Sequence, residues 1–121
     1  MAEHNLNGKW HSVYHYVSSS IPGLFDSAHD VEIIRKGEDI TIESLPNNEH
    51  SYLIMRLKFD DNVATGTWEE HSSPDGYYKG EIYTGAVQLV LTDDGDMFHG
   101  MYVCYDRRKE VRSGHWEITR K

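Results

Sequence analysis

The stretch LNGKWHSVYHYVSSS, residues 6–20, begins with a Gly-x-Trp triplet that returns at residues 66–68 and 114–116. The three triplets contain all three tryptophans of the chain, and residues 100–102, Gly-Met-Tyr, add a fourth aromatic copy. Because side chains alternate between the two faces of a strand, the glycine and the ring share one face, and the glycine leaves space on it. We interpret the triplet as a packing device of a small β-barrel, in which each large ring lies over neighbouring backbone.

Apolar and polar residues alternate between turn signals along the whole chain, whereas helical periodicity is nearly absent. We expect eight strands, at residues 8–18, 30–35, 40–45, 51–59, 63–70, 77–91, 97–105 and 110–119. The sixth segment is too long for one straight strand, so a bulge or corner is expected at Gly80 or Gly85. Short strands joined in sequence predict an all-β fold, an eight-stranded antiparallel up-and-down barrel that forms a single domain over residues 1–121.

The longest connection in this pattern, residues 19–29, contains the apolar residues Ile21, Leu24 and Phe25. Apolar side chains on a loop need a surface to pack against. We therefore expect this segment either to cover the mouth of the barrel as a lid or to plug the end of its core. A short helical turn over residues 24–28 is a further alternative.

Strand parity assigns the inward face. On the last expected strand, Trp116 and Ile118 alternate with the polar residues His115 and Glu117, so Trp116 faces inward. The same rule gives the second, third and fourth strands mainly aliphatic inward residues. It gives the first, fifth and seventh strands an inward face of hydroxyl, carboxyl, thiol and aromatic groups, and polar groups need partners when they are buried. We therefore predict a cavity for a small organic ligand. The candidate ligand-binding residues are Ser12, Tyr14, Tyr16, Met55, Trp68, Glu70, Tyr102 and Cys104. The residues expected to close one end of the barrel are Trp10 and Trp116.

Two short motifs resemble the calycin superfamily, which includes the lipocalins, the fatty-acid-binding proteins and the avidins. Residues 8–10 match the lipocalin Gly-x-Trp pattern of the first strand. Residues 6–10 match the longer Leu-x-Gly-x-Trp opening of avidin-like proteins, and residues 65–68 match their Thr-Gly-Thr-aromatic strand. The resemblance implies a lipocalin/avidin-like barrel.

The avidin-like pattern also implies where ligand contacts lie. It places polar contacts at Ser12 and at Tyr14 or Tyr16 on the first strand, and at Trp68 and Glu70 on a later strand. The chain lacks the several interior tryptophans that avidins carry near the far rim of the barrel, so biotin is not the expected ligand.

A second resemblance covers the sequences VATGTWEEHSSPDGYYKGEIYTGAVQLVL, from Val63 onward, and GHWEIT, from Gly114. Both are similar to β-rich segments of unassigned function that follow helix-turn-helix regions in some bacterial regulators. This similarity implies a bacterial ligand sensor.

Composition restricts the partners. The chain has a net charge of -8 and a pI near 5.4, which disfavours binding to nucleic acid or to an acidic membrane. Cys104 is the single cysteine, so no disulfide forms within the chain. No apolar run approaches the roughly 20 residues that span a bilayer, and no leader peptide is recognised, so we expect a cytoplasmic protein.

The eight histidines raise the question of a metal site. His11 and His15 share a face, but four strand residues span about 13 Å, which is too far for two ligands of one ion. The acidic residues 93–96 have the Asp-Gly signature of a hairpin turn and the wrong spacing for a calcium loop. Other histidines expected on the surface, at strand ends or turns, are His29, His50, His71 and His99. Spacing along one strand leaves a metal site between strands open, but we expect neither a metal nor a cofactor.

Three functions remain open. The first is small-molecule binding, with Glu70 as a contact in the cavity or as a solvated group near the rim. The second is a protein-interaction or dimerisation module with a filled core, which leaves a homo-oligomer open. Its outward apolar residues are Val13, Val17, Ile54, Met101 and Val103. The third is a barrel-based isomerase or hydrolase with Glu70 as general base, for which no second catalytic group is found. Cys104 is interpreted as a small core residue rather than a nucleophile.

Overall fold

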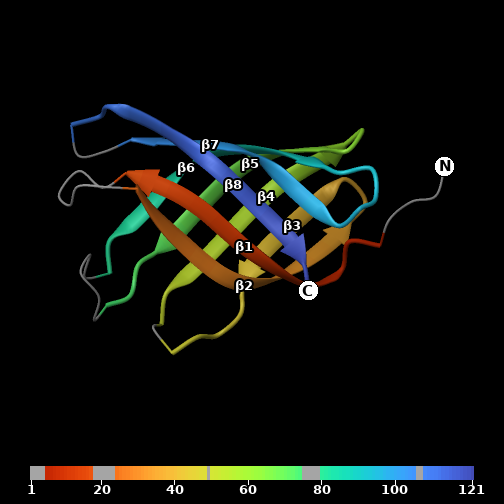
Figure 1. The fold of residues 1–121 in the computed structure, drawn as a ribbon, viewed down its shortest axis with the longest axis horizontal. Coiled ribbons are helices and arrows are strands. Elements are labelled where there is room, and N and C mark those ends of the chain that lie inside the picture. The colour runs from red at the N-terminus through yellow and green to blue at the C-terminus, as the bar shows by residue number, and fades with distance from the viewer. Residues whose placement is uncertain (1–4, 18–23, 49, 75–79, 106–107) are drawn as a thin grey trace.

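The chain forms a closed antiparallel barrel of eight strands, in which every strand pairs with its sequence neighbours and the last pairs with the first (Figure 1). The computed structural model describes residues 5–17, 24–48, 50–74, 80–105 and 108–121. The strands are β1 (Gly8–Val17), β2 (Leu24–Lys36), β3 (Asp39–Ser44), β4 (Tyr52–Asp60), β5 (Val63–His71), β6 (Ile82–Leu91), β7 (Met97–Tyr105) and β8 (Val111–Arg120). The predicted all-β up-and-down barrel is confirmed.

The second strand is longer than predicted. β2 begins at Leu24 rather than at residue 30, so the expected helical turn over residues 24–28 is wrong. The connection between the first two strands is therefore shorter than the expected residues 19–29. β2 pairs with β1 along the whole of that strand, with His15 opposite Asp26. The polar residues of this segment resemble a loop in sequence, but in the barrel they alternate between the two faces of a strand. Residues 19–23 of the expected lid or plug lie outside the described residues.

The sixth strand is shorter than predicted. It begins at Ile82, after Gly80, whose φ of +74° is a conformation that favours glycine, and it continues without a break through Gly85. Gly80 therefore lies in a turn before the strand, and the described strand has no corner at Gly85. Residues 77–79 of the predicted strand lie outside the described residues.

Glycines and rings pair across neighbouring strands. Trp68 lies opposite Gly85, Trp116 opposite Gly100, and Tyr102 opposite Gly114. A Cβ atom added to Gly85 would lie 2.9 Å from the Trp68 ring nitrogen, and one added to Gly114 would lie 2.8 Å from Tyr102 ring atoms. The triplets on β7 and β8 therefore lie in register, with the Tyr102 ring covering Gly114, while a Cβ atom on Gly100 would meet the backbone of Gln88.

The first triplet has a different basis. Gly8 lies opposite Ile33, and among the described residues other than its two chain neighbours no atom lies within 4 Å of the position that its Cβ would take. Its φ of +134° is the feature that requires glycine there. The repeated sequence motif thus serves two structural purposes.

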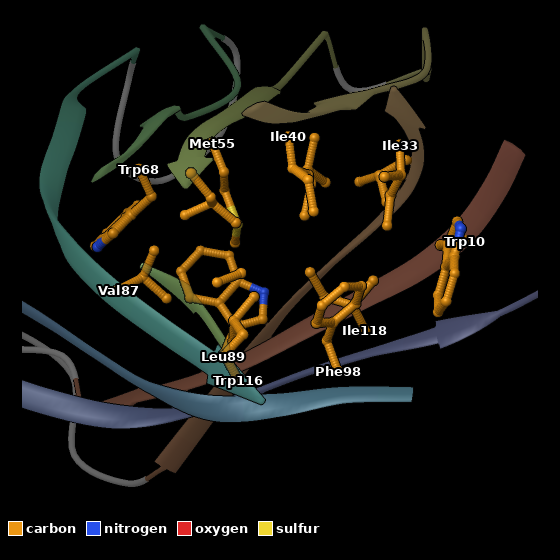
Figure 2. Close-up of a cluster of buried hydrophobic side chains, with 14 of the residues drawn as sticks. Trp10, Ile33, Ile40, Met55, Trp68, Val87, Leu89, Phe98, Trp116 and Ile118 are labelled. Carbon is orange, nitrogen blue, oxygen red and sulfur yellow. The ribbon is translucent and has the colours of Figure 1, made fainter. Parts of the chain in front are cut away.

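The barrel has two different ends. The turn end carries the short turns at residues 37–38, 61–62 and 92–96, which join β2 to β3, β4 to β5, and β6 to β7 (Figure 1). The loop end is the opposite one, where β1, β3, β5 and β7 finish. Trp10 lies toward the turn end and Trp68 far from it, with Trp116 between them (Figure 2).

The interior at the turn end is apolar and filled. Trp10 packs against Phe98 with ring centroids 5.7 Å apart, and Leu6, which precedes β1, accepts a hydrogen bond from the indole nitrogen of Trp10 at 3.0 Å. The guanidinium of Arg120 lies 4.3 Å from the Trp10 ring centroid, and that of Arg35 lies 4.9 Å from the centroid of Phe59. Side chains thus close this end of the barrel.

Candidate functional site

A buried carboxylate occupies the interior toward the loop end. Glu70, on β5, is only 6% exposed. One of its oxygens accepts a hydrogen bond from the hydroxyl of Tyr14 on β1, and the other accepts one from Ser27 on β2 at 2.6 Å. Tyr14 and Ser27 are register partners on adjacent strands, so two neighbouring hydroxyl groups reach across the interior to one acid.

His29 adds a second titratable group to this site. Its Nδ1 lies 3.7 Å from a Glu70 oxygen, and its Nε2 lies 2.9 Å from the hydroxyl of Ser51. The expected surface position of His29 is wrong, because β2 extends past it and parity turns its side chain inward with those of Val31 and Ile33. The chain therefore does contain a second acid–base group beside Glu70.

Aromatic rings surround Tyr14 on several sides. Its ring centroid lies 4.5 Å from that of Trp116, 5.2 Å from that of Tyr102 and 5.6 Å from that of Trp68. Trp116 thus lies within this cluster, opposite Tyr14 in register, and not beside Trp10, which pairs with Arg120. The expectation that Trp10 and Trp116 close the same end is wrong, because the two residues lie at different depths of the barrel.

The polar atoms of these rings are hydrogen-bonded. The indole nitrogen of Trp116 donates to the Ser12 hydroxyl at 2.8 Å, and the Tyr102 hydroxyl donates to the carbonyl of His15 at 2.5 Å. The indole nitrogen of Trp68 donates to the carbonyl of Val103 at 3.3 Å. These bonds hold the ring orientations around the carboxylate.

Both buried tyrosines are held in their neutral form. Burial raises the pKa of Tyr14 well above 10.0, and the negative charge of Glu70 raises it further. Burial also raises the pKa of Tyr102 far above its usual value, and Cys104 and Glu70 add to the effect. Each hydroxyl therefore remains a hydrogen-bond donor at neutral pH.

Exposure increases along the inward wall toward the loop end. The inward residues Trp10, Ile118 and Ile33 are fully buried near the turn end, whereas Tyr16 and Cys104 near the loop end are half-buried. Ser27 and Tyr83 are half-buried inward residues as well. Water therefore reaches part of the inward wall at this end of the barrel.

The site contains most of the residues that parity selected. Ser12, Tyr14, Trp68, Glu70 and Tyr102 come together in the buried cluster, while Tyr16 and Cys104 lie nearer the rim. Met55 is fully buried beside Trp68, its register partner on β5, and belongs to the apolar wall.

Sequence reasoning missed Ser27, His29 and Tyr83. A signal for the first two was present, because continuing the parity of Val31 and Ile33 upstream turns His29 and Ser27 inward. The polar composition of the segment concealed that signal.

The outer histidines bind acids on neighbouring strands. His11 pairs with Asp30 at 2.9 Å, and His15 pairs with Asp26 at 2.5 Å, each across the β1–β2 register. Among the residues that the structure describes, no group of three or more histidine, cysteine, aspartate or glutamate side chains is arranged to hold a metal ion. Within the same described part, no helix is long and apolar enough to cross a membrane.

The barrel is consistent with a calycin-like fold, having eight antiparallel strands in sequential order. No family model, curated protein or solved structure matches the chain.

Proposed function

We propose that the barrel binds a small organic molecule at its loop end, through the carboxylate of Glu70 and the rings around it. The observation that carries this proposal is the buried acid itself, held by the hydroxyls of Tyr14 and Ser27. The ligand is a flat molecule that carries a hydrogen-bond donor. Its donor binds Glu70, and its ring stacks among the aromatic side chains.

Energetics supports a functional role for the acid. Burying a carboxylate is costly, and well-packed hydrophobic residues in the same place often give equal or greater stability. The turn end of the same barrel is filled by apolar side chains, so the fold does not need a charge to close. A polar group kept at such a cost is expected to serve recognition or chemistry.

Hydrogen-bonding capacity supports it as well. An ionised carboxylate has about four lone-pair sites on its two oxygens. Tyr14 and Ser27 each use one oxygen, and His29 lies 3.7 Å away, so further acceptor capacity remains for a ligand donor. The half-buried residues Tyr16 and Cys104 line the approach from the loop end.

The resemblances fit this role. A calycin-type barrel that binds a ligand inside its strands is the architecture that the first-strand motif implies. The similarity of residues 63–91 to segments of bacterial regulators supports a sensing role, in which ligand binding is reported to another part of a cell's machinery.

The test compares two glutamates that both accept a hydrogen bond from a tyrosine. Glu70 is buried beside Tyr14, whereas Glu43 is exposed and accepts from Tyr52 at 2.7 Å. A library of flat amines, amides and phenols is screened by melting temperature and tryptophan fluorescence. A ligand at 100 times its Kd adds about 2.7 kcal/mol to the stability of the wild-type protein.

We expect Glu70→Gln to lose most of this ligand-dependent stabilisation and Glu43→Gln to retain it. The same ligand is sought by mass spectrometry in the denatured extract of protein purified from cells. No stabilising compound in the library and no co-purified small molecule would together contradict the proposal.

Acid–base catalysis is a second candidate, which the closeness of His29 to Glu70 favours. Two titratable groups within 4 Å can move a proton to and from one substrate. Ester, amide and keto–enol substrates are assayed with the wild-type protein, Glu70→Gln and His29→Gln. Turnover that both substitutions abolish supports catalysis, and a wild-type protein without turnover that still binds a ligand supports binding alone.

A further inference from the structure

Two adjacent strands of the barrel carry no charged residue. β6, IYTGAVQLVL, and β7, MFHGMYVCY, contain no lysine, arginine, aspartate or glutamate. Each of the other six strands contains at least one. The two strands are neighbours in the barrel, so their outward side chains form one continuous region.

Exposed apolar side chains concentrate on this region. We define the uncharged face as the outward side chains of β6 and β7 together with Val111 and Ser113 of β8. Among the residues whose exposure the structure describes, six of the eight large exposed hydrophobic ones lie on it: Ile82, Val90, Met101, Val103, Tyr105 and Val111. Register places Val103 opposite both Ala86 and Ser113, and Tyr105 opposite Val111, so apolar and small side chains are contiguous there.

The opposite outer surface is charged. Acidic residues hydrogen-bonded by basic side chains cover it, with His11 and Lys121 on Asp30, and His15 on Asp26. Lys58 pairs with Asp39 between β3 and β4. The two outer surfaces therefore differ in charge as well as in the number of exposed apolar residues.

From this contrast we propose that the uncharged face binds the same face of a second copy of the chain, which forms a two-fold symmetric dimer. A chain with a net charge of -8 repels its own copies wherever acidic groups meet. The uncharged face is the region where two copies approach with the least repulsion, and an uncharged apolar surface is complementary to itself, as a two-fold contact requires.

The closed barrel directs this contact to side chains. Each described strand of the barrel pairs with a neighbour on both sides, and β6 and β7 pair with each other and with β5 and β8, so a contact on this face is made by side chains. Two strands about 4.8 Å apart and about 30 Å long, with the first residues of β8 beside them, offer the apolar centre of a standard interface, which buries roughly 800 Å² per partner. Thr67 and Glu69 on β5 and His115 and Glu117 on β8 supply a polar rim.

Other outward apolar residues do not belong to this interface. Ile54, which parity also places outward, is buried within its own chain, and Val13 is half-buried between the ion pairs of β1 and β2. The side chain of Val17 lies outside the described residues. Of the five residues first considered for an interaction face, Met101 and Val103 form the exposed part.

The experiment compares two exposed, β-branched, outward side chains. Val103 on the uncharged face is 42% exposed, and Ile34 on the charged surface is 47% exposed. Mass in solution is measured by sedimentation over a wide range of concentrations for the wild-type chain, Val103→Glu and Ile34→Glu. Both variants change the net charge by the same amount, so a general electrostatic effect moves both equally.

We expect the wild-type chain to reach twice its mass of 14.0 kDa as the concentration rises. Val103→Glu should weaken the dimer at least tenfold, and Ile34→Glu should leave its Kd within about twofold. Gln88→Glu, which keeps the shape of an outward β6 residue, should weaken the dimer in the same direction. The Gln88→Glu variant replaces Val103→Glu in this test if Val103→Glu fails to fold. A wild-type chain of single mass at all concentrations overturns the proposal, as does equal weakening by substitutions on the two surfaces.

Discussion

The turn end and the loop end of the barrel enclose the same strands and bury their side chains by different chemistry. At the turn end, Trp10 and Phe98 pack against each other among aliphatic residues. Of these two rings, only that of Trp10 has a polar atom, its indole nitrogen, which donates a hydrogen bond to the carbonyl of Leu6. At the loop end, rings surround the carboxylate of Glu70, which is satisfied by hydroxyl groups from two other strands. The comparison indicates that one end contributes stability and that the other keeps polar groups at a cost to stability.

The largest effect is expected when a buried side chain at the apolar turn end is shortened. Phe98→Ala should lower the free energy of unfolding by about 3–5 kcal/mol, because it removes a fully buried ring and leaves a cavity. Ile34→Ala, on the charged surface, removes an exposed side chain and should cost less than about 1 kcal/mol. Urea denaturation measures both. A loss below about 1 kcal/mol for Phe98→Ala would show that the turn end does not carry the core.

A smaller effect is expected at the polar end. Tyr14→Phe removes one hydroxyl from the buried carboxylate and should cost about 1.5–3 kcal/mol, the range for hydrogen bonds to charged groups. Tyr52→Phe removes the equivalent bond from exposed Glu43, where water replaces it, and should cost less than about 0.5 kcal/mol. Equal losses in urea denaturation would contradict the assignment of a buried, solvent-excluded acid.

The smallest effect is a dependence of stability on high pH. The pKa of Tyr14 and that of Tyr102 are raised in the fold above 10.0, the value taken for the unfolded chain. Above about pH 10 the unfolded chain therefore binds fewer protons than the native one, and stability falls as pH rises. The slope is up to about 1.4 kcal/mol per pH unit for each tyrosine, and neither group contributes to the pH dependence well below pH 10.

Urea denaturation at pH 8, 10 and 11 measures this slope. Tyr14→Phe should reduce the slope of stability against pH by the contribution of one ionising group, since phenylalanine does not ionise. An unchanged slope in this variant would show that Tyr14 ionises as readily in the fold as in the unfolded chain.

Parity along single strands predicted much of the site. The inward positions of Ser12, Tyr14 and Glu70 follow from the two-residue period of a strand, once Trp10 and Trp68 are known to face inward. His29 was missed because its segment has the polar composition of a loop, although pairing with β1 makes it a strand. Local composition competed with tertiary pairing there, and pairing prevailed.

The amino-acid pattern alone was enough to establish the number and order of the strands, the up-and-down barrel and the face to which most side chains point, because alternation is a property of each strand by itself. The sequence did not establish how deep each side chain lies in the barrel or which side chains it contacts. Closure of the sheet decides which rings meet. It places Trp116 beside Tyr14 rather than beside Trp10, and it brings Ser27 and Tyr14 to one carboxylate on β5. Closure brings together residues more than 40 positions apart, such as Ser27 and Glu70, and no local period contains that distance.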